Sequence, residues 1–430
     1  PISHGVLGEA SRQRLRTKMR RRNLISCRLG PRRRYSYPMQ PITTTAQLAE
    51  FCKSLKGQPF VAVDTEFMRE TTYWPKLCLI QVAAPNGAQA CIDPLADGLD
   101  LSPLLDILRD ETVDKVFHAA RQDVEIFNNL GAMPRPLFDT QIAGMAAGFG
   151  EQIAYDALVR QMLKIDLDKS SRFTDWARRP LSDNQLTYAI ADVTHLADLY
   201  PKLRARLVKD GRLAWVEEEM AALTDPALYD VEPENAWKRL KPRKHVPKYL
   251  AVFKAVAAWR ERTAQQRDQP RGRILKDDAI DELAAQAPTD AAAMDRLRGV
   301  PKGFSGSKFG PDLLEAIREA LKDPDAYAPK IDRERAPQNA AAGAVVELLK
   351  VLLKARAEDA GVASKLLATV SDLEKIANDD NADVGALQGW RLDAFGADAL
   401  KLKRGELALV LDGTRVRVVE VRRAPKAASA

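Results

Sequence analysis

The sequence predicts an α/β domain built on a mixed β-sheet, followed by all-helical domains. Strand-like and helix-like patterns alternate between residues 45 and 208, which is typical of an α/β fold. The first three strand-like runs follow one another with short connections, and this favours antiparallel pairing. Beyond residue 236, the spacing of apolar residues is helical almost to the end of the chain.

The strands of this sheet are predicted from short apolar runs that are rich in β-branched residues. We expect them at residues 60–66, 77–83, 89–93, 114–118 and 136–139. Apolar residues at helical spacing predict helices at residues 101–109, 121–130, 139–147, 153–163, 183–208 and 211–223. Ser182 and Gln185 have the spacing of a capping box, and Gly131 suits the end of a helix.

Breaks in these patterns divide the chain into domains and connections. We expect the α/β domain at residues 39–223, a first helical domain at 236–322, and a second at 344–422 that ends in a hairpin. Linkers rich in proline, alanine and charge are expected at 224–235 and 323–343, and a tail at 423–430. The hairpin is predicted from an Asp-Gly pair between alternating valines.

The first 38 residues form a basic extension that we leave out of the fold. Residues 1–38 carry 11 Lys and Arg but a single acid, Glu9. Such a composition is typical of a transit peptide or of an arm that binds nucleic acid. We favour a third interpretation, in which this stretch is sequence upstream of the gene that has been translated by mistake and Met39 is the native start. The reason is that periodic structure begins only near Thr45.

The remaining charge is unevenly distributed along the chain. The net charge is −11 over residues 39–235, +8 over 236–322 and zero over 323–430. An acidic unit followed by a basic one favours a polyanion as partner of the basic unit.

Composition also bears on where the protein works. The four cysteines lack the spacing of zinc ligands, and three of them lie among apolar neighbours. We therefore expect reduced, packed thiols and a cytoplasmic location. Hydrophobic residues make up 46% of the chain, and no apolar run is as long as a membrane span. We therefore expect a soluble protein without a membrane partner. We also expect it to act as a monomer.

The stretch VAVDTEF at residues 61–67 places two acids in a run that otherwise has the pattern of a buried strand. Side chains alternate along a strand, so Asp64 and Glu66 project from the same face. Two unpaired buried carboxylates would repel each other and lose their hydration at high cost. A bound cation is the usual way in which a protein resolves this conflict.

Two predicted helices offer further inward-facing polar groups. Asp123 shares a helix face with Phe127 and follows a strand, so it is expected near the carboxyl end of the sheet. Tyr188 and Asp192 are four residues apart along the edge of an apolar helix face, so they project in the same direction. The sequence thus gathers four acids and a phenol on one strand and two helices.

Two divalent cations would satisfy these carboxylates. In such a site one ion activates a water molecule and the other stabilises the leaving oxygen of a phosphodiester, while Tyr188 would orient the attacking water. Ligation by oxygen alone favours Mg²⁺ or Mn²⁺ over zinc.

Three motifs resemble those of the DEDD superfamily of 3′–5′ exonucleases, in its tyrosine-bearing branch: DTEF at 64–67, HAARQD at 118–123 and YAIAD at 188–192. The longer strings FVAVDTEFMRETTYWPKLCLIQVA and LSDNQLTYAIADVTHLADLY resemble the ribonuclease D family more closely. The resemblance covers roughly residues 41–322 and, more loosely, 344–406. It implies a ribonuclease-H-like exonuclease domain and two helical domains of the helicase-and-ribonuclease-D C-terminal (HRDC) type, the second one diverged.

The resemblance also implies roles for the acids. Asp64, Glu66 and Asp192 would hold one ion, and Asp64 would bridge to a second ion near Asp123. Ala119 stands where some superfamily members have asparagine, which removes a polar substrate contact but no metal ligand.

Several residues outside the acidic group are candidate contacts to nucleic acid or supports of the site. The apolar and basic candidates for binding are Phe67, Met68, Trp74, Lys241, Arg243, Lys244 and Lys308. For Gln81 we expect a cap on the edge of its strand, with a sugar contact as the alternative. His118 is expected to be a hydrogen-bonded residue at a strand end, and Asp139 to cap the next helix.

The function predicted from these features is a metal-dependent 3′–5′ exoribonuclease that releases 5′-mononucleotides, with tRNA precursors carrying 3′ extensions as the implied substrates. A 3′–5′ DNA exonuclease is one alternative, because residue types alone do not identify a side chain that contacts the 2′-hydroxyl of RNA. A nucleic-acid-binding protein with an inactive nuclease fold is the other.

Overall fold

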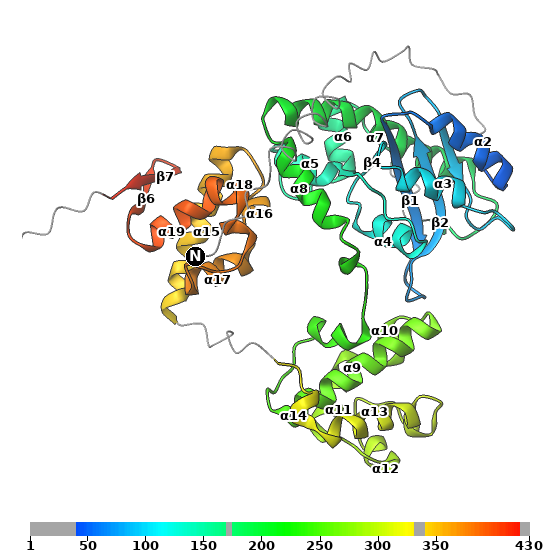
Figure 1. Cartoon of the computed structure of the whole chain (residues 1–430), viewed down its shortest axis with the longest axis vertical. Helices are drawn as coiled ribbons and strands as arrows, with labels where there is room; N and C mark the ends of the chain where they lie inside the picture. Colours follow the sequence, from blue (N-terminus) through cyan, green and yellow to red (C-terminus); the bar gives the residue numbers. More distant parts are fainter. Residues whose placement is uncertain (1–39, 169–173, 331–339, 422–430) are drawn as a thin grey trace, which may run out of the picture. The chain divides into compact units, whose positions relative to one another are not determined.

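The structure is a computed structural model that describes residues 40–168, 174–330 and 340–421 (Figure 1). The basic extension predicted at 1–38 and the tail predicted at 423–430 lie outside the described residues, as do Cys27 and part of the second predicted linker. Cys52, Cys78 and Cys91 are buried free thiols.

A five-stranded mixed sheet forms the framework of the α/β domain (Figure 1). The order of its strands is β3-β2-β1-β4-β5. The central strand β1 (Phe60–Met68) pairs in antiparallel fashion with β2 (Lys76–Ala83), which pairs in the same way with β3 (Gln89–Ile92). On its other side β1 is parallel to β4 (Asp114–Phe117), and β4 is parallel to β5 (Leu137–Asp139). The predicted mixed sheet and its antiparallel first three strands are confirmed.

Helices cover both faces of the sheet, so its strands are apolar on both sides. Val61 and Val63 of β1 pack in a core with α2 (Thr45–Leu55), α3 (Ser102–Arg109) and α4 (Arg121–Asn129). The helices on the opposite face, where Phe60 and Ala62 point, are α5 (Thr140–Ala146), α6 (Tyr155–Leu163), α7 (Asp183–Lys209) and α8 (Leu213–Leu223).

Helix α2 is the element of this domain that the sequence analysis missed. It begins at a capping box between Thr44 and Gln47 and buries Leu48, Cys52 and Leu55. The capping box of Ser182 and Gln185 at the start of α7, which was predicted, is present. Gly131 follows α4 with a positive φ of 78°, as expected of a residue that ends a helix.

Strand β1 extends beyond its parallel neighbour, and this creates the place for a site. The pairing of β1 with β4 ends at Ala62, whereas its pairing with β2 continues to Met68. Residues 64–66 therefore lie beyond the carboxyl end of the ladder with β4. Helix α4 begins in this region, because the chain leaves β4 and turns into α4 within a few residues.

The segment predicted as the first linker is partly structured. It contains the 3₁₀ helices η1 (Pro226–Leu228) and, from Pro233, η2 (Pro233–Arg239). Tyr229 is buried among the residues that pack on α3 and α4. The α/β domain thus extends its packing past residue 223, where the apolar periodicity of the sequence ends.

The first helical domain is organised around the long helix α9 (Pro247–Arg267), whose Val252, Phe253 and Val256 are buried. The shorter elements that accompany it are α10 (Arg271–Ile274), α11 (Asp277–Gln286), α12 (Ala291–Asp295), η3 (Phe304–Gly306), α13 (Gly310–Lys322) and α14 (Pro324–Tyr327).

The second helical domain begins with α15 (Ala340–Ala360), inside the predicted second linker. It continues with α16 (Ser364–Leu367), α17 (Val370–Asn378), η4 (Gly385–Leu387), α18 (Gly389–Arg391), a π-helical segment (Leu392–Gly396) and α19 (Ala397–Lys403). The predicted hairpin is present as antiparallel strands β6 (Leu407–Asp412) and β7 (Arg415–Glu420). Among the described residues, no helix is long and apolar enough to cross a membrane.

The two helical domains share a Phe-Gly pair at the start of a late helical segment. A Cβ atom on Gly310 would lie 2.1 Å from the carbonyl oxygen of Ser305. One on Gly396 would lie 2.2 Å from the carbonyl oxygen of Ala386. In both domains the backbone therefore approaches so closely that no side chain fits. This common packing supports the interpretation of the second domain as a diverged copy of the first.

We expect Gly310→Ala and Gly396→Ala each to lower the free energy of unfolding of their domain by about 1–3 kcal/mol, because the added methyl group must displace backbone atoms. Urea unfolding measures this loss. Matched controls are Gly306→Ala and Gly385→Ala, where an added Cβ would meet nothing within 4 Å. Equal effects of the test and control variants would contradict the close-approach explanation.

Candidate active site

Three carboxylates from β1 and α7 form the centre of the candidate site. Asp64 and Glu66 project from one face of β1, and Asp192 comes from α7, which covers that face. Carboxylate oxygens of the three residues lie within 4.8 Å of one another. The convergence that the sequence predicted for these three acids is therefore present in the structure.

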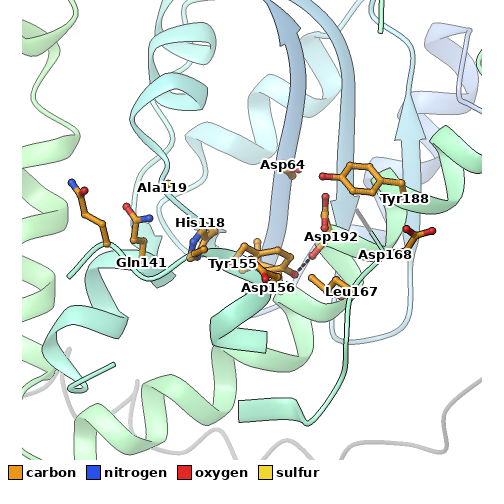
Figure 2. Close-up of a pocket in the computed structure, with 13 residues that line it drawn as sticks. Asp64, His118, Ala119, Gln141, Tyr155, Asp156, Leu167, Asp168, Tyr188 and Asp192 are labelled. Carbon is orange, nitrogen blue, oxygen red and sulfur yellow. Dashed lines mark hydrogen bonds between the residues drawn. The ribbon is translucent and has the colours of Figure 1, made fainter. Parts of the chain in front are cut away.

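Helix α7 holds its polar residues at the edge of an apolar interface. Ala189 and Val193, next to Tyr188 and Asp192 in the sequence, are fully buried against the sheet. This packing fixes the rotation of α7 about its axis. Figure 2 shows the Tyr188 hydroxyl directed toward Asp64 and Asp192.

Asp123 occupies a separate position at the open edge of β1. Its side chain is 7% exposed. The Thr65 hydroxyl donates a hydrogen bond of 2.5 Å to its carboxylate. Thr65 faces the opposite side of β1 from Asp64. Asp123 therefore lies on the Thr65 side of the strand, and not on the face that carries Asp64 and Glu66. It is not part of the group of three, yet the Asp64 charge acts on it.

The site strongly disfavours negative charge in the absence of an ion. Burial, followed by the charges of Asp64, Asp192 and Asp123, raises the pKa of Glu66 to about 9. Burial raises the pKa of Asp64 to about 6, and burial together with Asp64 raises the pKa of Asp123 well above its usual value.

This electrostatic imbalance is the observation that fits a bound cation. Every influence recorded on Glu66 favours its protonated form, so a positive ion would remove the conflict. The donors are all carboxylate oxygens, which suit hard divalent cations such as Mg²⁺ and Mn²⁺.

A cavity of about 380 Å³ opens beside the acids (Figure 2). Its volume lies within the range of sites that hold one small molecule, roughly 300–1,000 Å³. Its walls include Asp64, Tyr188 and Asp192, together with the polar residues His118, Gln141, Gln152, Tyr155, Asp156 and Asp168.

Tyr155, on the first turn of α6, is a residue of this cavity that the sequence analysis missed. Its hydroxyl donates a hydrogen bond to the backbone carbonyl of Asp192, and its ring lies 5.2 Å from that of His118. Burial raises its pKa well above the usual value, so the hydroxyl keeps its proton at neutral pH. A tyrosine at a helix start carries no sequence signal for such a position.

The loop after β4 is held by Asp139, which caps α5 as predicted. Its carboxylate also accepts hydrogen bonds of 2.9 Å and 2.8 Å from the backbone N–H groups of Ala119 and Ala120. Ala119 has a φ of 59°, a conformation that asparagine adopts more readily than alanine. His118 is hydrogen-bonded to Thr140 and to the carbonyl of Ile153, as expected of a strand-end histidine.

The candidate contacts after the first motif are partly occupied by protein. Phe67 and Met68 are half-buried, and Met68 packs on the core beneath α7. Trp74 packs against residues of the first helical domain, and its backbone N–H donates to Asp268. Contact of these three side chains with nucleic acid stays a prediction.

The basic candidates differ in their surroundings. Arg243 forms ion pairs of 3.1 Å and 3.2 Å with Asp278 and Asp281, so part of its charge is compensated. The Nζ atom of Lys308 lies 5.3 Å from the centre of the Phe309 ring. Lys241 and Lys244 are exposed, and no ion pair of theirs occurs within the described part of the chain.

Comparison with known proteins identifies the class of this site. Residues 39–208 match the sequence profile of a 3′-5′ exonuclease family, and residues 249–317 match that of the HRDC domain. The α/β domain is therefore a 3′–5′ exonuclease domain, and the predicted fold class is confirmed.

Curated relatives narrow this class further. The chain is 53% identical to Ribonuclease D of Nitrobacter hamburgensis over 89% of this chain and 100% of that protein. It is 50% identical to Ribonuclease D of Granulibacter bethesdensis over 88% of this chain and 96% of that protein. The chain therefore belongs to the ribonuclease D family and is a 3′–5′ exoribonuclease that acts on RNA.

A solved structure agrees with this membership. The crystal structure of Escherichia coli RNase D, described as an exoribonuclease involved in structured RNA processing, matches with a TM-score of 0.74 and 30% identity. The match covers 85% of this chain and 98% of that chain.

The raised pKa values predict an unusual dependence of stability on pH. Between the ordinary pKa of Glu66, 4.5, and its value of about 9 in the folded protein, the folded state binds more protons than the unfolded state. In EDTA, stability should therefore fall as pH rises through this window, by at most about 1.4 kcal/mol per pH unit for one proton. Urea unfolding at pH 6 to 9 measures the slope.

Glu66→Gln should remove most of this slope, because the amide does not titrate. Glu70→Gln, at a nearby exposed position, is the control and should keep it. If Glu66→Gln leaves the slope of the free energy of unfolding against pH unchanged, the group that titrates is not Glu66.

Proposed function

We propose that Asp64, Glu66 and Asp192 hold one divalent cation, and that Asp64 and Asp123 take part in holding a second. The convergence of three partly buried carboxylates carries this proposal, because such a group keeps all its negative charges at neutral pH only with positive charge beside it. Bound Mg²⁺ or Mn²⁺ would supply Lewis-acid activation of water and stabilisation of charge on the departing oxygen.

The reaction we propose for this site is hydrolysis of the last phosphodiester of an RNA chain. Water attacks phosphorus, the bond from phosphorus to the 3′ oxygen of the preceding nucleotide breaks, and that oxygen takes a proton. The products are a 5′-mononucleotide and an RNA with a new 3′-hydroxyl end.

The protein's own residues have distinct tasks in this proposal. Tyr188 orients the attacking water through its hydroxyl, which is directed at the acids. The cavity beside Asp64 receives the terminal nucleotide and limits the access of bulk water. Tyr155 holds Asp192 in place through its bond to the Asp192 carbonyl.

The substrates we propose are tRNA precursors with 3′ extensions. We propose that the protein acts on them as a monomer in the cytoplasm. Reduced, buried thiols are compatible with that compartment. Because the exonuclease domain is acidic, the exposed lysines of the first helical domain would supply the attraction for the RNA backbone.

We expect Asp64→Asn to lower turnover by about 10³-fold or more while RNA affinity changes by less than about twofold, because the first helical domain binds RNA separately. The assay follows a 5′-labelled tRNA with a 3′ extension, with Mg²⁺, Mn²⁺ or EDTA, and a single-stranded DNA beside it.

Asp106→Asn, at an exposed position on α3, is the control and should retain activity. Shortening of the DNA as well as the RNA would leave the DNA exonuclease as an equal candidate. Intact RNA in every reaction would favour a binding protein, and equal loss of binding and turnover in Asp64→Asn would contradict the separation of tasks.

Replacing both Lys241 and Lys244 by alanine should weaken RNA binding and reduce the slope of log K against log salt by about 2, because two phosphate contacts are lost. The corresponding control replaces Lys53 and Lys56, which are exposed on the acidic domain. An unchanged salt slope in the test variant would show that these lysines do not contact RNA.

A further inference from the structure

Gln81 is a buried amide without a partner in the described structure. Its side chain is 0% exposed, and neither Nε2 nor Oε1 has a hydrogen-bond partner. The expectation that Gln81 caps the edge of a strand is wrong, because the residue lies inside β2, between β1 and β3. It is paired with Asp64 on one side and with Cys91 on the other.

The surroundings of this amide on its own strand are apolar. Leu79 and Ala83, the neighbours of Gln81 on the same face of β2, belong to the buried core under α7. An unpaired amide in such a place costs free energy that an apolar side chain of the same size would not. Buried polar groups are almost always hydrogen-bonded, so this one calls for a specific partner.

The sheet register places Gln81 beside the metal centre proposed above. Residues directly opposite in an antiparallel pair project from the same face, with Cβ atoms about 4.5–5.5 Å apart. The side chain of Gln81 therefore starts next to that of Asp64. Gln81 is not among the residues that line the cavity, so it is placed to act on Asp64 and not on the RNA.

We propose that Gln81 is a positioning residue for the metal centre, whose Nε2 donates a hydrogen bond to the Asp64 carboxylate when the cation is bound. The inference rests on the metal centre of the proposed function. A carboxylate that holds a cation keeps acceptor positions that do not face the ion, and an amide on the neighbouring strand can donate to one of them. The bond would orient the oxygen that faces the ion, as groups behind metal ligands commonly do.

The test compares Gln81→Met with the wild-type chain, using Mn²⁺ alone as the probe. Methionine matches glutamine in length but removes the amide. We expect the affinity for Mn²⁺, measured by isothermal titration calorimetry, to fall about 10- to 100-fold. In EDTA, the midpoint of urea unfolding should stay the same or rise, because an unpaired amide has been removed.

Gln89→Met is the matched control. Gln89 pairs with Ala83 and so lies on the same face of the sheet, but its amide already accepts a hydrogen bond of 3.0 Å from Thr194. This variant should bind Mn²⁺ as the wild type does.

Equal Mn²⁺ affinity of wild type and Gln81→Met would overturn the inference and make the amide a structural group only. Absence of Mn²⁺ binding by the wild type would instead overturn the metal centre itself. If Gln81→Met does not fold, Gln81→Leu takes its place. A second, independent measurement uses the wild type. If the proposal holds, adding Mg²⁺ shifts the resonance of a glutamine side-chain amide in the ¹H–¹⁵N spectrum. A spectrum in which no such resonance moves overturns the proposal.

Discussion

The burial of like charges on one strand is the constraint on which the rest of the structure depends. Asp64 and Glu66 stand on the central strand of a sheet that is covered on both faces. Such charges are tolerable only where a cation and a solvent cavity reach them. The short β4 and the cavity beside α7 provide this access, and the apolar face of α7 aligns Asp192 with the strand.

The same constraint explains the division of charge along the chain. A nuclease domain built around acids is itself acidic and repels the RNA backbone. The following domain, which matches the HRDC profile, carries the compensating basic residues. In the function proposed above, attraction and chemistry lie in different domains, so that the proposed ligands of the cation need not also attract the substrate.

Much of the fold and of the site was predictable because the signals are local. The alternating pattern around Asp64 predicts which side chains share a face of the strand. The spacing of Tyr188 and Asp192 does the same for the edge of an apolar helix face. Helix α2 was missed although it has a clear capping box. Tyr229 was placed in a linker because a single buried residue between 3₁₀ helices leaves no periodic pattern.

The sequence by itself determined the class of sheet, the face on which the acids meet and the preference for a hard cation, because these follow from side-chain period and donor type. Only the tertiary structure decided that Asp123 stands apart on the Thr65 side, that Tyr155 supports Asp192, and that Gln81 lies unpaired opposite Asp64. The physical reason is that strand register, strand length and the packing of α6 on α7 join residues far apart in the chain, which no local pattern records.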